Sequence, residues 1–399
     1  MTSFAFNARR GWPAAMLAIF VLAYIVYATT VITAWPDNGR TLAFALLAGT
    51  AFGIVLQRSR FCFFCVTRDF IDHKDASGLV GIAVALAVGT IGYHVLFSAF
   101  LPIPAPGRLP PGAHIGPVSW VLVLGSLAFG VGMAVSGSCI SAHMYRLGEG
   151  SVASIFALLG ALAGFGLGFA SWNSLYLMTI QEAPIVWLPQ SMGYGGSLLL
   201  QLALLVVVVG FLLKRHNASG SSSVARSGLT WESVLVHRWP TWVGGLLVAF
   251  IGVLSYFRYA PLGVTAELGS VSRTAASRWS LLPERLEGLD SFSGCATVVK
   301  EALFSPNGLF VLGLIGGAWA AALVAGEFKP RLPSWRDVAR NFGGGLLMGW
   351  GAMIALGCTV GTLLSGIMAG ALSGWVFAVA CLAGVWGGWR LRQKLSASR

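Results

Sequence analysis

Long apolar runs without charge decide what this chain can fold into. Runs such as 78–101 and 196–213 contain no Asp, Glu, Lys or Arg. A transmembrane helix needs about 20 such residues, and the runs lack the strict alternation of barrel strands. Only 10% of the residues are charged, whereas a typical soluble domain has about 25%. The sequence therefore predicts an all-α integral membrane protein and excludes a soluble enzyme.

The apolar runs predict about ten transmembrane helices. The expected spans are 14–35, 41–57, 78–101, 118–138, 152–170, 196–213, 241–257, 308–326, 341–358 and 371–389. The first run follows Arg9 and Arg10, as in a signal peptide. However, it is longer than the apolar core of such a peptide and ends without a small-x-small cleavage site. We therefore expect 1–40 to be retained as an extra N-terminal transmembrane helix.

The distribution of Lys and Arg predicts the orientation of the chain in the membrane. With a cytoplasmic N-terminus, 19 of the 26 basic residues fall in cytoplasmic segments. Both termini are then expected in the cytoplasm. This asymmetry accounts for most of the net charge of +12, so the charge requires no nucleic-acid partner.

Two segments share the pattern G-x4-G-x-G-x6-C at a constant offset of 219 residues. The matched residues are Gly125, Gly130, Gly132 and Cys139 in the first copy, and Gly344, Gly349, Gly351 and Cys358 in the second. Each copy ends the third span of a four-span group, 41–170 or 241–389. Because the charge distribution orients the two groups oppositely, the sequence predicts inverted-topology repeats, a common design in transporters.

The remaining segments join or flank the repeats. Residues 171–240 are expected to form a connecting helix and a cytoplasmic linker, which is rich in serine over 217–227. Within the second repeat, 258–307 is expected to be a long outer loop, and 390–399 a basic cytoplasmic tail. A ligand site is expected where the two repeats face each other near the bilayer midplane.

The glycines of the repeated pattern have two expected roles. Small residues let neighbouring helix backbones approach closely. This role is expected of Gly130, Gly132, Gly349 and Gly351. Gly137 and Gly357 precede the cysteines and are expected to break or re-enter each helix inside the membrane. A broken helix exposes N–H groups with a partial positive charge, which suit an anion. The alternative is helix packing alone, which does not require the matched cysteines.

Three of the six cysteines, Cys62, Cys139 and Cys358, are expected at helix breaks or ends in or beside the membrane. A thiol is a soft, weakly donating group, so it suits a soft sulfur atom better than a hard oxygen ligand. No histidine or carboxylate is spaced with these cysteines as a ligand set. We therefore expect neither a metal site nor a cofactor.

Two further cysteines have other expected roles. Cys65 follows Cys62 with the CxxC spacing of a thiol–disulfide enzyme, so a membrane oxidoreductase using this pair is the alternative function. Cys381 lies within an apolar span and is expected to pack there.

Three arginines, Arg58, Arg60 and Arg68, lie close to Cys62 in the sequence. Two interpretations remain open. The arginines anchor a helix end in the inner leaflet, or their guanidinium groups balance the charge of a dianion that leaves the pore.

Three groups of motifs resemble those of one known protein family. They are RSRFCF followed by TRD, GVGMAVSGSC followed by YRLGEGS, and GGLLMGWGAMIALGC followed by TVGTLLSG. They resemble the YeeE/YedE-like sulfur transport family. The resemblance implies uptake of a small sulfur-containing oxyanion across the inner membrane of a bacterial cell, and not an enzymatic activity. Thiosulfate is the expected substrate, with related sulfur or selenium species as alternatives.

The resemblance also implies a mechanism and partners. Cys62, Cys139 and Cys358 are then expected to relay the anion along the pore through S–H contacts. The expected partners are the sulfur anion, the lipid bilayer and a small cytosolic sulfurtransferase of the sulfur-carrier type.

Overall fold

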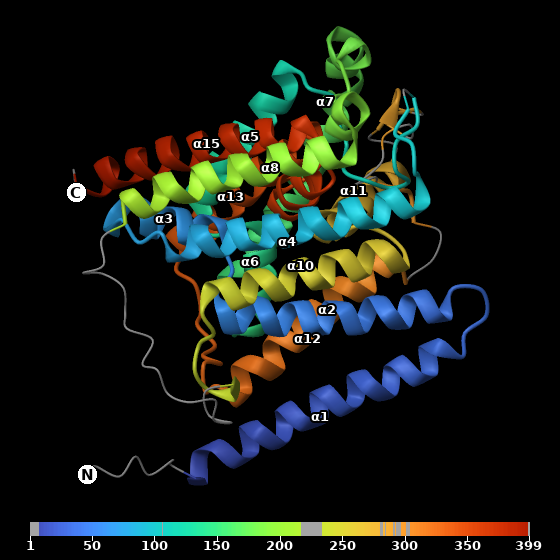
Figure 1. Cartoon of the computed structure of the whole chain (residues 1–399). Helices are drawn as coiled ribbons and strands as arrows, with labels where there is room; N and C mark the ends of the chain where they lie inside the picture. The colour runs from blue at the N-terminus through green and yellow to red at the C-terminus, as the bar shows by residue number, and fades with distance from the viewer. Residues whose placement is uncertain are drawn as a thin grey trace.

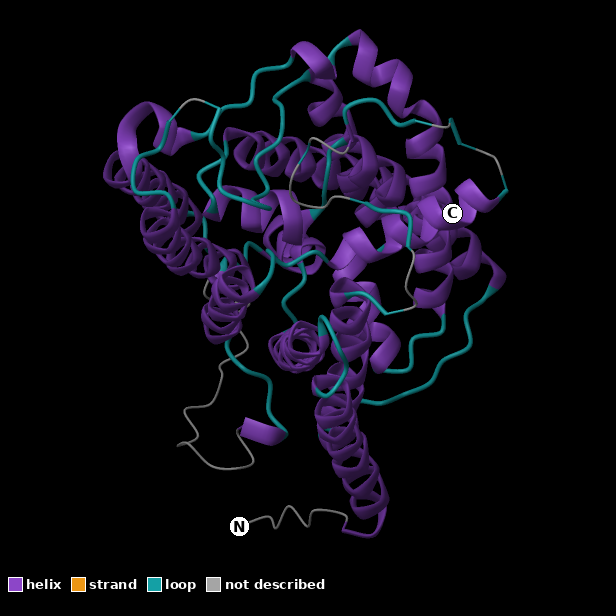
Figure 2. Ribbon diagram, turned by 90° about the vertical axis from the view of Figure 1, so that its right-hand side faces the viewer, coloured by secondary structure: helices purple, strands orange, loops and turns teal. Residues whose placement is uncertain are grey.

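A computed structural model of the chain describes residues 8–105, 107–216, 234–279, 282–283, 285–289, 292, 297–300 and 304–397. These residues form helices joined by loops, and none of them belongs to a β-strand (Figure 2). The predicted serine-rich linker 217–227 and Cys295 lie outside the described residues.

The chain forms long helices with shorter ones between them. In chain order they are α1 (Ala8–Thr33), α2 (Gly39–Ser59), α3 (Phe63–His73), α4 (Ser77–Phe100), α5 (Trp120–Ser136), α6 (Ile140–Gly148), α7 (Ala153–Met178), η1 (Ile180–Glu182), α8 (Leu188–Lys214), α10 (Thr241–Arg258), α11 (Val264–Arg278), α12 (Pro306–Val324), α13 (Trp335–Ile354), η4 (Thr359–Ser365), α14 (Gly366–Met368) and α15 (Leu372–Ala397).

The helix lengths agree with a membrane protein. Among the described residues, nine helices are long and apolar enough to cross a bilayer, or ten if α13 and the bent segment after it count as one span. The predicted all-α membrane protein of about ten spans is therefore confirmed. Each predicted span coincides with one of the long helices α1, α2, α4, α5, α7, α8, α10, α12, α13 and α15.

Shorter helices follow the breaks in the long ones. They are α3, α6, α11 and η4 with α14, and the hydropathy pattern did not predict them. Helix α11 lies inside the predicted outer loop 258–307, and it packs against α7 and α12 instead of lying outside the bundle. It is only 15 residues long and holds charged side chains, so it has no apolar run of membrane length.

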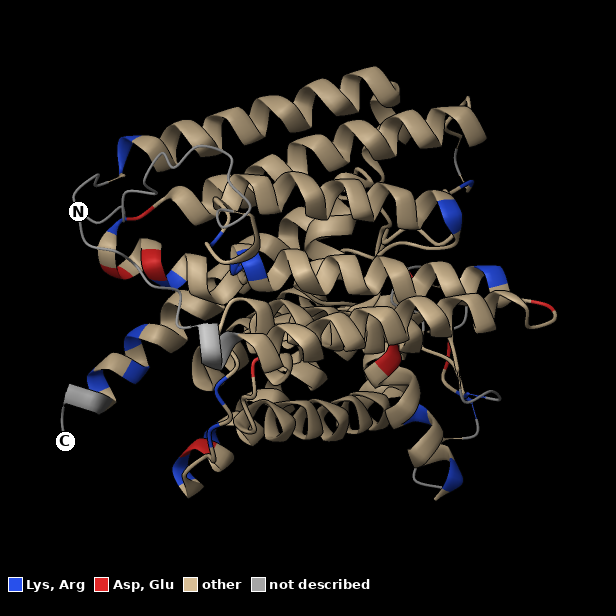
Figure 3. Ribbon diagram, turned by 90° about the horizontal axis from the view of Figure 1, so that it is seen from below, with Lys and Arg blue, Asp and Glu red and all other residues tan. Residues whose placement is uncertain are grey.

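The long helices lie side by side in pairs (Figure 1). Helix α2 packs along α12, and α10 packs along α4. In the other half of the bundle α13 packs along α7, and α15 packs along α5. Helices α5 and α13 also pack against each other, and α1 lies at the edge of the bundle against α2 and α12 (Figure 1). The start of α1 and the end of α15 lie at the same side of the bundle (Figures 1 and 3).

Glycines bring the backbones of α5 and α13 into contact. A Cβ atom added at Gly351 would lie 2.4 Å from the carbonyl oxygen of Gly125. At Gly132 it would lie 2.6 Å from the carbonyl oxygen of Gly344. Any other residue at these positions would force the two helices apart, because no Cβ atom approaches a backbone oxygen so closely.

The same helices use glycine against their outer neighbours. A Cβ atom at Gly130 of α5 would lie 2.2 Å from the carbonyl oxygen of Cys381 in α15. One at Gly349 of α13 would lie 2.1 Å from the carbonyl oxygen of Ala161 in α7. Each half of the repeated glycine pattern is therefore in close backbone contact with two other helices.

Helix α13 allows a matched test of this packing. Gly349→Ala is expected to lower the unfolding temperature of the purified protein in detergent, because overpacking of a tight contact costs about 1–3 kcal/mol. Gly343 lies in the same helix, with nothing within 4 Å of an added Cβ atom. Gly343→Ala is expected to keep or raise the unfolding temperature, since alanine is favoured over glycine in a helix by about 1 kcal/mol. Equal effects of the two substitutions would contradict the packing.

Candidate functional site

The three cysteines predicted as site residues occupy equivalent places in the fold. Cys62, Cys139 and Cys358 are the N-cap residues of α3, α6 and η4. None of these caps uses a side-chain hydrogen bond to satisfy the first N–H groups of its helix. The positive ends of three helix dipoles therefore lie beside the three thiols.

Left-handed backbone positions make these breaks possible. Gly137 ends α5 with a φ of 87°, and Gly357 lies between α13 and η4 with a φ of 153°. Glycine has no Cβ atom and adopts these angles without strain. Arg60 after α2 and Leu356 after α13 also have positive φ angles, of 48° and 53°. The segment after Cys358 is a π-helix, a wide helix that is frequent at functional sites.

Two of the three cysteines lie together. The Sγ atoms of Cys62 and Cys139 are 4.0 Å apart, and neither residue is exposed to solvent. The hydroxyl of Ser141 lies 3.3 Å from the Cys139 sulfur. Cys65, one helical turn after Cys62, joins this pair from α3. We call Cys62, Cys65 and Cys139 the inner thiol cluster.

Arg146 completes this part of the site, and the sequence analysis did not select it. Its guanidinium donates from Nη2 to the sulfur of Cys65 over 3.3 Å, and from Nη1 to the carbonyl oxygen of Gly137 over 3.3 Å. Arg146 thus links the inner thiol cluster to the break between α5 and α6. The available signal was its position in YRLGEGS, the motif that follows SGSC in the sequence after residues 140–144.

Cys358 lies apart from the inner thiol cluster. It is buried beside Thr265 at the start of α11, and Cys381 of α15 is also near it. Cys381 is fully enclosed and packs against α5, as its place in an apolar span suggested.

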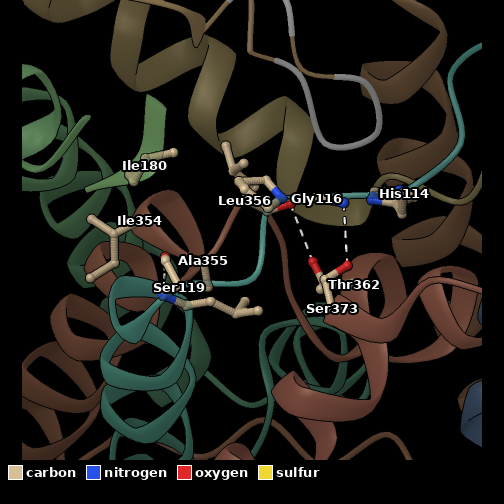
Figure 4. Close-up of a pocket in the computed structure, with 11 residues that line it drawn as sticks. His114, Gly116, Ser119, Ile180, Ile354, Ala355, Leu356, Thr362 and Ser373 are labelled. Carbon is tan, nitrogen blue, oxygen red and sulfur yellow. Dashed lines mark hydrogen bonds between the residues drawn. The ribbon is translucent and has the colours of Figure 1, made fainter. Parts of the chain in front are cut away.

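A small pocket, which we call the outer pocket, adjoins the break at Cys358 (Figure 4). Ile354, Leu356 and Thr362 line it from both sides of the break, and His114 and Ser373 line it from neighbouring segments. The Thr362 hydroxyl donates to the Leu356 carbonyl over 3.2 Å, as Figure 4 shows. The volume of the outer pocket is only about 10 Å³, which is about the room of a single water molecule. The outer pocket therefore has no room for a larger ligand in this structure.

A large cavity, which we call the inner cavity, opens at the other end of the bundle. Its volume is about 950 Å³, and Cys65 and Arg146 form part of its wall. His216 after α8 and Arg238 before α10 also line it. These residues place the opening at the side of the bundle where α15 ends. The large inner cavity and the small outer pocket therefore lie at opposite ends of the bundle.

The three arginines near Cys62 have different partners. Arg58 is buried, and its Nη2 atom donates to the backbone carbonyl oxygens of Val236 and His237. It therefore anchors the segment before α10, whereas Arg60 and Arg68 line the inner cavity. Arg68 forms an ion pair with Asp69 over 2.7 Å.

A polar network joins four segments at the rim of the inner cavity. The buried amide of Gln57 donates from Nε2 to Glu149 over 3.3 Å and to Glu327 over 2.7 Å. Burial raises the pKa of Glu149. Burial also disfavours the charge of Glu327, but the hydrogen bond and charge of Arg238, the charge of Arg60 and the hydrogen bond from Gln57 together outweigh burial and lower the pKa of Glu327. The network ties α2 to the loops after α6 and α12 and to the segment before α10.

Metal binding finds no support in the described part of the chain. The residues described there include no group of three or more His, Cys, Asp or Glu side chains that could hold a metal ion.

Comparison with known proteins identifies the family. The sequence profile described as "Sulphur transport" matches residues 58–387. The chain belongs to this family. It is 30% identical over 349 residues to the thiosulfate transporter TsuA of Spirochaeta thermophila, covering 86% of this chain and 96% of that protein. It is 26% identical over 347 residues to the thiosulfate transporter TsuA of Escherichia coli, covering 86% and 92%.

A third relative matches over part of its length. The chain is 39% identical over 169 residues to the probable transporter YedE of Escherichia coli, which is 41% of each protein. The family predicted from the motifs is thus confirmed, and the chain is a membrane transporter of the sulfur transport family. The alternative of a thiol–disulfide enzyme that uses Cys62 and Cys65 is set aside, because the family and these relatives are transporters.

The short distance between two sulfur atoms can be tested by cross-linking. A variant that keeps only Cys62 and Cys139 is expected to form a disulfide rapidly with copper phenanthroline. Its sulfur atoms start 4.0 Å apart, and a side-chain rotation brings them to the bonding distance of about 2 Å. A variant that keeps only Cys62 and Cys381 is the control and is expected to stay reduced. Cleavage between the cysteines, followed by gel electrophoresis, detects the link; equal behaviour of both variants would contradict the structure.

Proposed function

We propose that this protein takes up thiosulfate across a bacterial inner membrane. The observation that carries the proposal is the placement of Cys62, Cys139 and Cys358 at the caps of three broken helices. Two relatives that match over most of their length are thiosulfate transporters, which supports this choice of anion. Related sulfur or selenium anions are the competing substrates.

A dianion inside a membrane needs favourable contacts along its whole path. Without donors and positive charge, moving it into a low-dielectric interior is strongly disfavoured. The S–H groups can contact the terminal sulfur of thiosulfate, while the positive helix ends face its negative charge. These contacts are weak, so the anion can leave each site, as conduction requires. The proposed path runs from the outer pocket past Cys358 to the inner thiol cluster and the inner cavity.

We infer that the two halves of the chain are inverted repeats. Reciprocal glycine contacts support this inference. Gly125 meets Gly351, and Gly132 meets Gly344, which are the pairs that a two-fold axis would relate under the offset of 219 residues. Likewise Gly130 meets α15 where its counterpart Gly349 meets α7. The axis then passes between α5 and α13, near the proposed path.

The delivery of the anion suggests a cytosolic partner. With the basic residues and both termini on the cytoplasmic side, the inner cavity opens toward the cytoplasm. A small sulfurtransferase of the sulfur-carrier type is the proposed acceptor there, in agreement with the family resemblance.

Uptake of labelled thiosulfate by reconstituted vesicles tests the proposed relay. Cys139→Ala and Cys358→Ala are expected to abolish uptake, because each removes a donor from the path, and Cys62→Ala is expected to impair it. Cys381→Ala is the matched control, since this buried thiol packs beside the path, and its uptake is expected to stay near the wild-type rate. Normal uptake by both Cys139→Ala and Cys358→Ala would refute the relay. Unlabelled sulfite and selenium anions, added as competitors, rank the substrates.

Reporter fusions test the proposed orientation. A reporter joined after residue 220 is expected to be cytoplasmic, because α8 ends at the side where α1 begins. A reporter joined at Glu182, in the short η1 before α8, is expected outside the cytoplasm. Alkaline phosphatase activity at the first position and none at the second would show the opposite orientation and contradict the proposal.

A further inference from the structure

The arginines of the inner cavity do not have equivalent surroundings. Four of them line it: Arg60, Arg68, Arg146 and Arg238. The charges of Arg68 and Arg238 are matched by carboxylates, Asp69 over 2.7 Å and Glu327 over 3.0 Å. Within the described residues, neither Arg60 nor Arg146 has a carboxylate oxygen within 4.0 Å. Of these two, Arg146 is the arginine that contacts the inner thiol cluster.

The contacts of Arg146 leave its charge available. A guanidinium has five N–H donors, and two of the groups that this one contacts are the Gly137 carbonyl oxygen and the Cys65 sulfur. Its side chain is partly buried against α3 and the break after α5. A positive charge withdrawn from water is stabilised by an opposite charge, and neutral dipoles replace that charge only in part. The floor of the inner cavity therefore favours a small anion.

The two kinds of group at this place match the two ends of thiosulfate. The flat guanidinium fork suits two oxygen atoms of an oxyanion, which it can bind in a bidentate way. The thiols of Cys65, Cys62 and Cys139 suit the soft terminal sulfur. The Cys65 sulfur lies 3.3 Å from the guanidinium, so one small anion can touch both kinds of group at once.

We propose that Arg146 binds the oxygen end of the transported anion at the floor of the inner cavity, with the terminal sulfur directed toward the inner thiol cluster. This inference rests on the proposed transport of thiosulfate. Arg146 then forms the last site before release, where Arg60 and Arg68 lie along the way out. Sulfate offers the same oxygen atoms but no soft end, so it uses only half of this site.

Protection of Cys65 from alkylation tests this site directly. Cys65 lines the cavity, so a small maleimide is expected to modify it in the purified protein, and mass spectrometry reports the modified fraction. Thiosulfate is expected to slow the modification in the wild type. Arg146→Gln is expected to raise the half-protecting concentration of thiosulfate by a factor on the order of ten to a hundred, as for the loss of a charged hydrogen bond. The half-protecting concentration is compared instead of the alkylation rate. Arg146 contacts the Cys65 sulfur, so the substitution itself can change the rate at which Cys65 is alkylated.

Further variants separate binding from structure. Arg146→Lys keeps the positive charge but not the two-pronged guanidinium. Its half-protecting concentration is expected to lie between those of the wild type and Arg146→Gln. Arg336→Gln removes an exposed arginine that does not line the cavity, and it is expected to behave as the wild type. Sulfate is expected to protect less well than thiosulfate in the wild type, and to lose protection in Arg146→Gln by about the same factor.

The outcomes distinguish this inference from the proposed function. Wild-type half-protecting concentrations in both Arg146 variants would overturn the inference, and so would uptake of thiosulfate without any protection of Cys65. In both cases the proposed transport would stand. Absence of thiosulfate uptake by the wild type would instead refute the proposed function.

Discussion

The close backbone crossing of α5 and α13 holds the site together. Both helices break directly after the crossing, at Gly137 and Gly357, so the distance between the helix axes sets the positions of both breaks. With side chains of ordinary size the helices would pack about 8–10 Å apart. Instead, the contacts between them are glycine against backbone oxygen on both sides. Cys139 and Cys358 are therefore held near the centre of the bundle and not at its surface.

The breaks in turn have to be protected from lipid. In a bilayer each unpaired backbone group costs several kcal/mol, so irregular backbone is tolerated only inside protein or beside a water-filled cavity. Both conditions are met in this bundle. Cys62, Cys139 and Cys358 are almost fully enclosed. Leu356 and Thr362, on either side of Cys358, line the outer pocket, and Arg60 and Cys65, on either side of Cys62, line the inner cavity. The irregular backbone at these breaks is thus kept away from lipid.

Local sequence patterns predicted the long helices and the helix breaks at the cysteines, but not the tertiary contacts of the site. Apolar runs of membrane length marked the spans, and the glycine before each cysteine marked the breaks after α5 and α13. Helix α11 was missed because it is short and carries charged residues. The approach of Cys62 to Cys139 joins residues 77 positions apart, which spacing does not encode. Arg146 was missed because an arginine at a helix end usually anchors that end in the membrane.

The distribution of charge along the proposed path would favour binding of the anion but not its accumulation. The residues that line the outer pocket include no Lys or Arg, whereas four arginines line the inner cavity. A membrane potential of 100 mV, negative inside, opposes the entry of a dianion by about 5 kcal/mol, at about 2.3 kcal/mol per charge. Fixed arginines offset this cost only while the anion is bound, because they do not change the free-energy difference between the two solutions. Net uptake therefore requires either a coupled ion or removal of the anion by a reaction on the cytoplasmic side. A sulfur-accepting enzyme at the mouth of the inner cavity would supply the second of these.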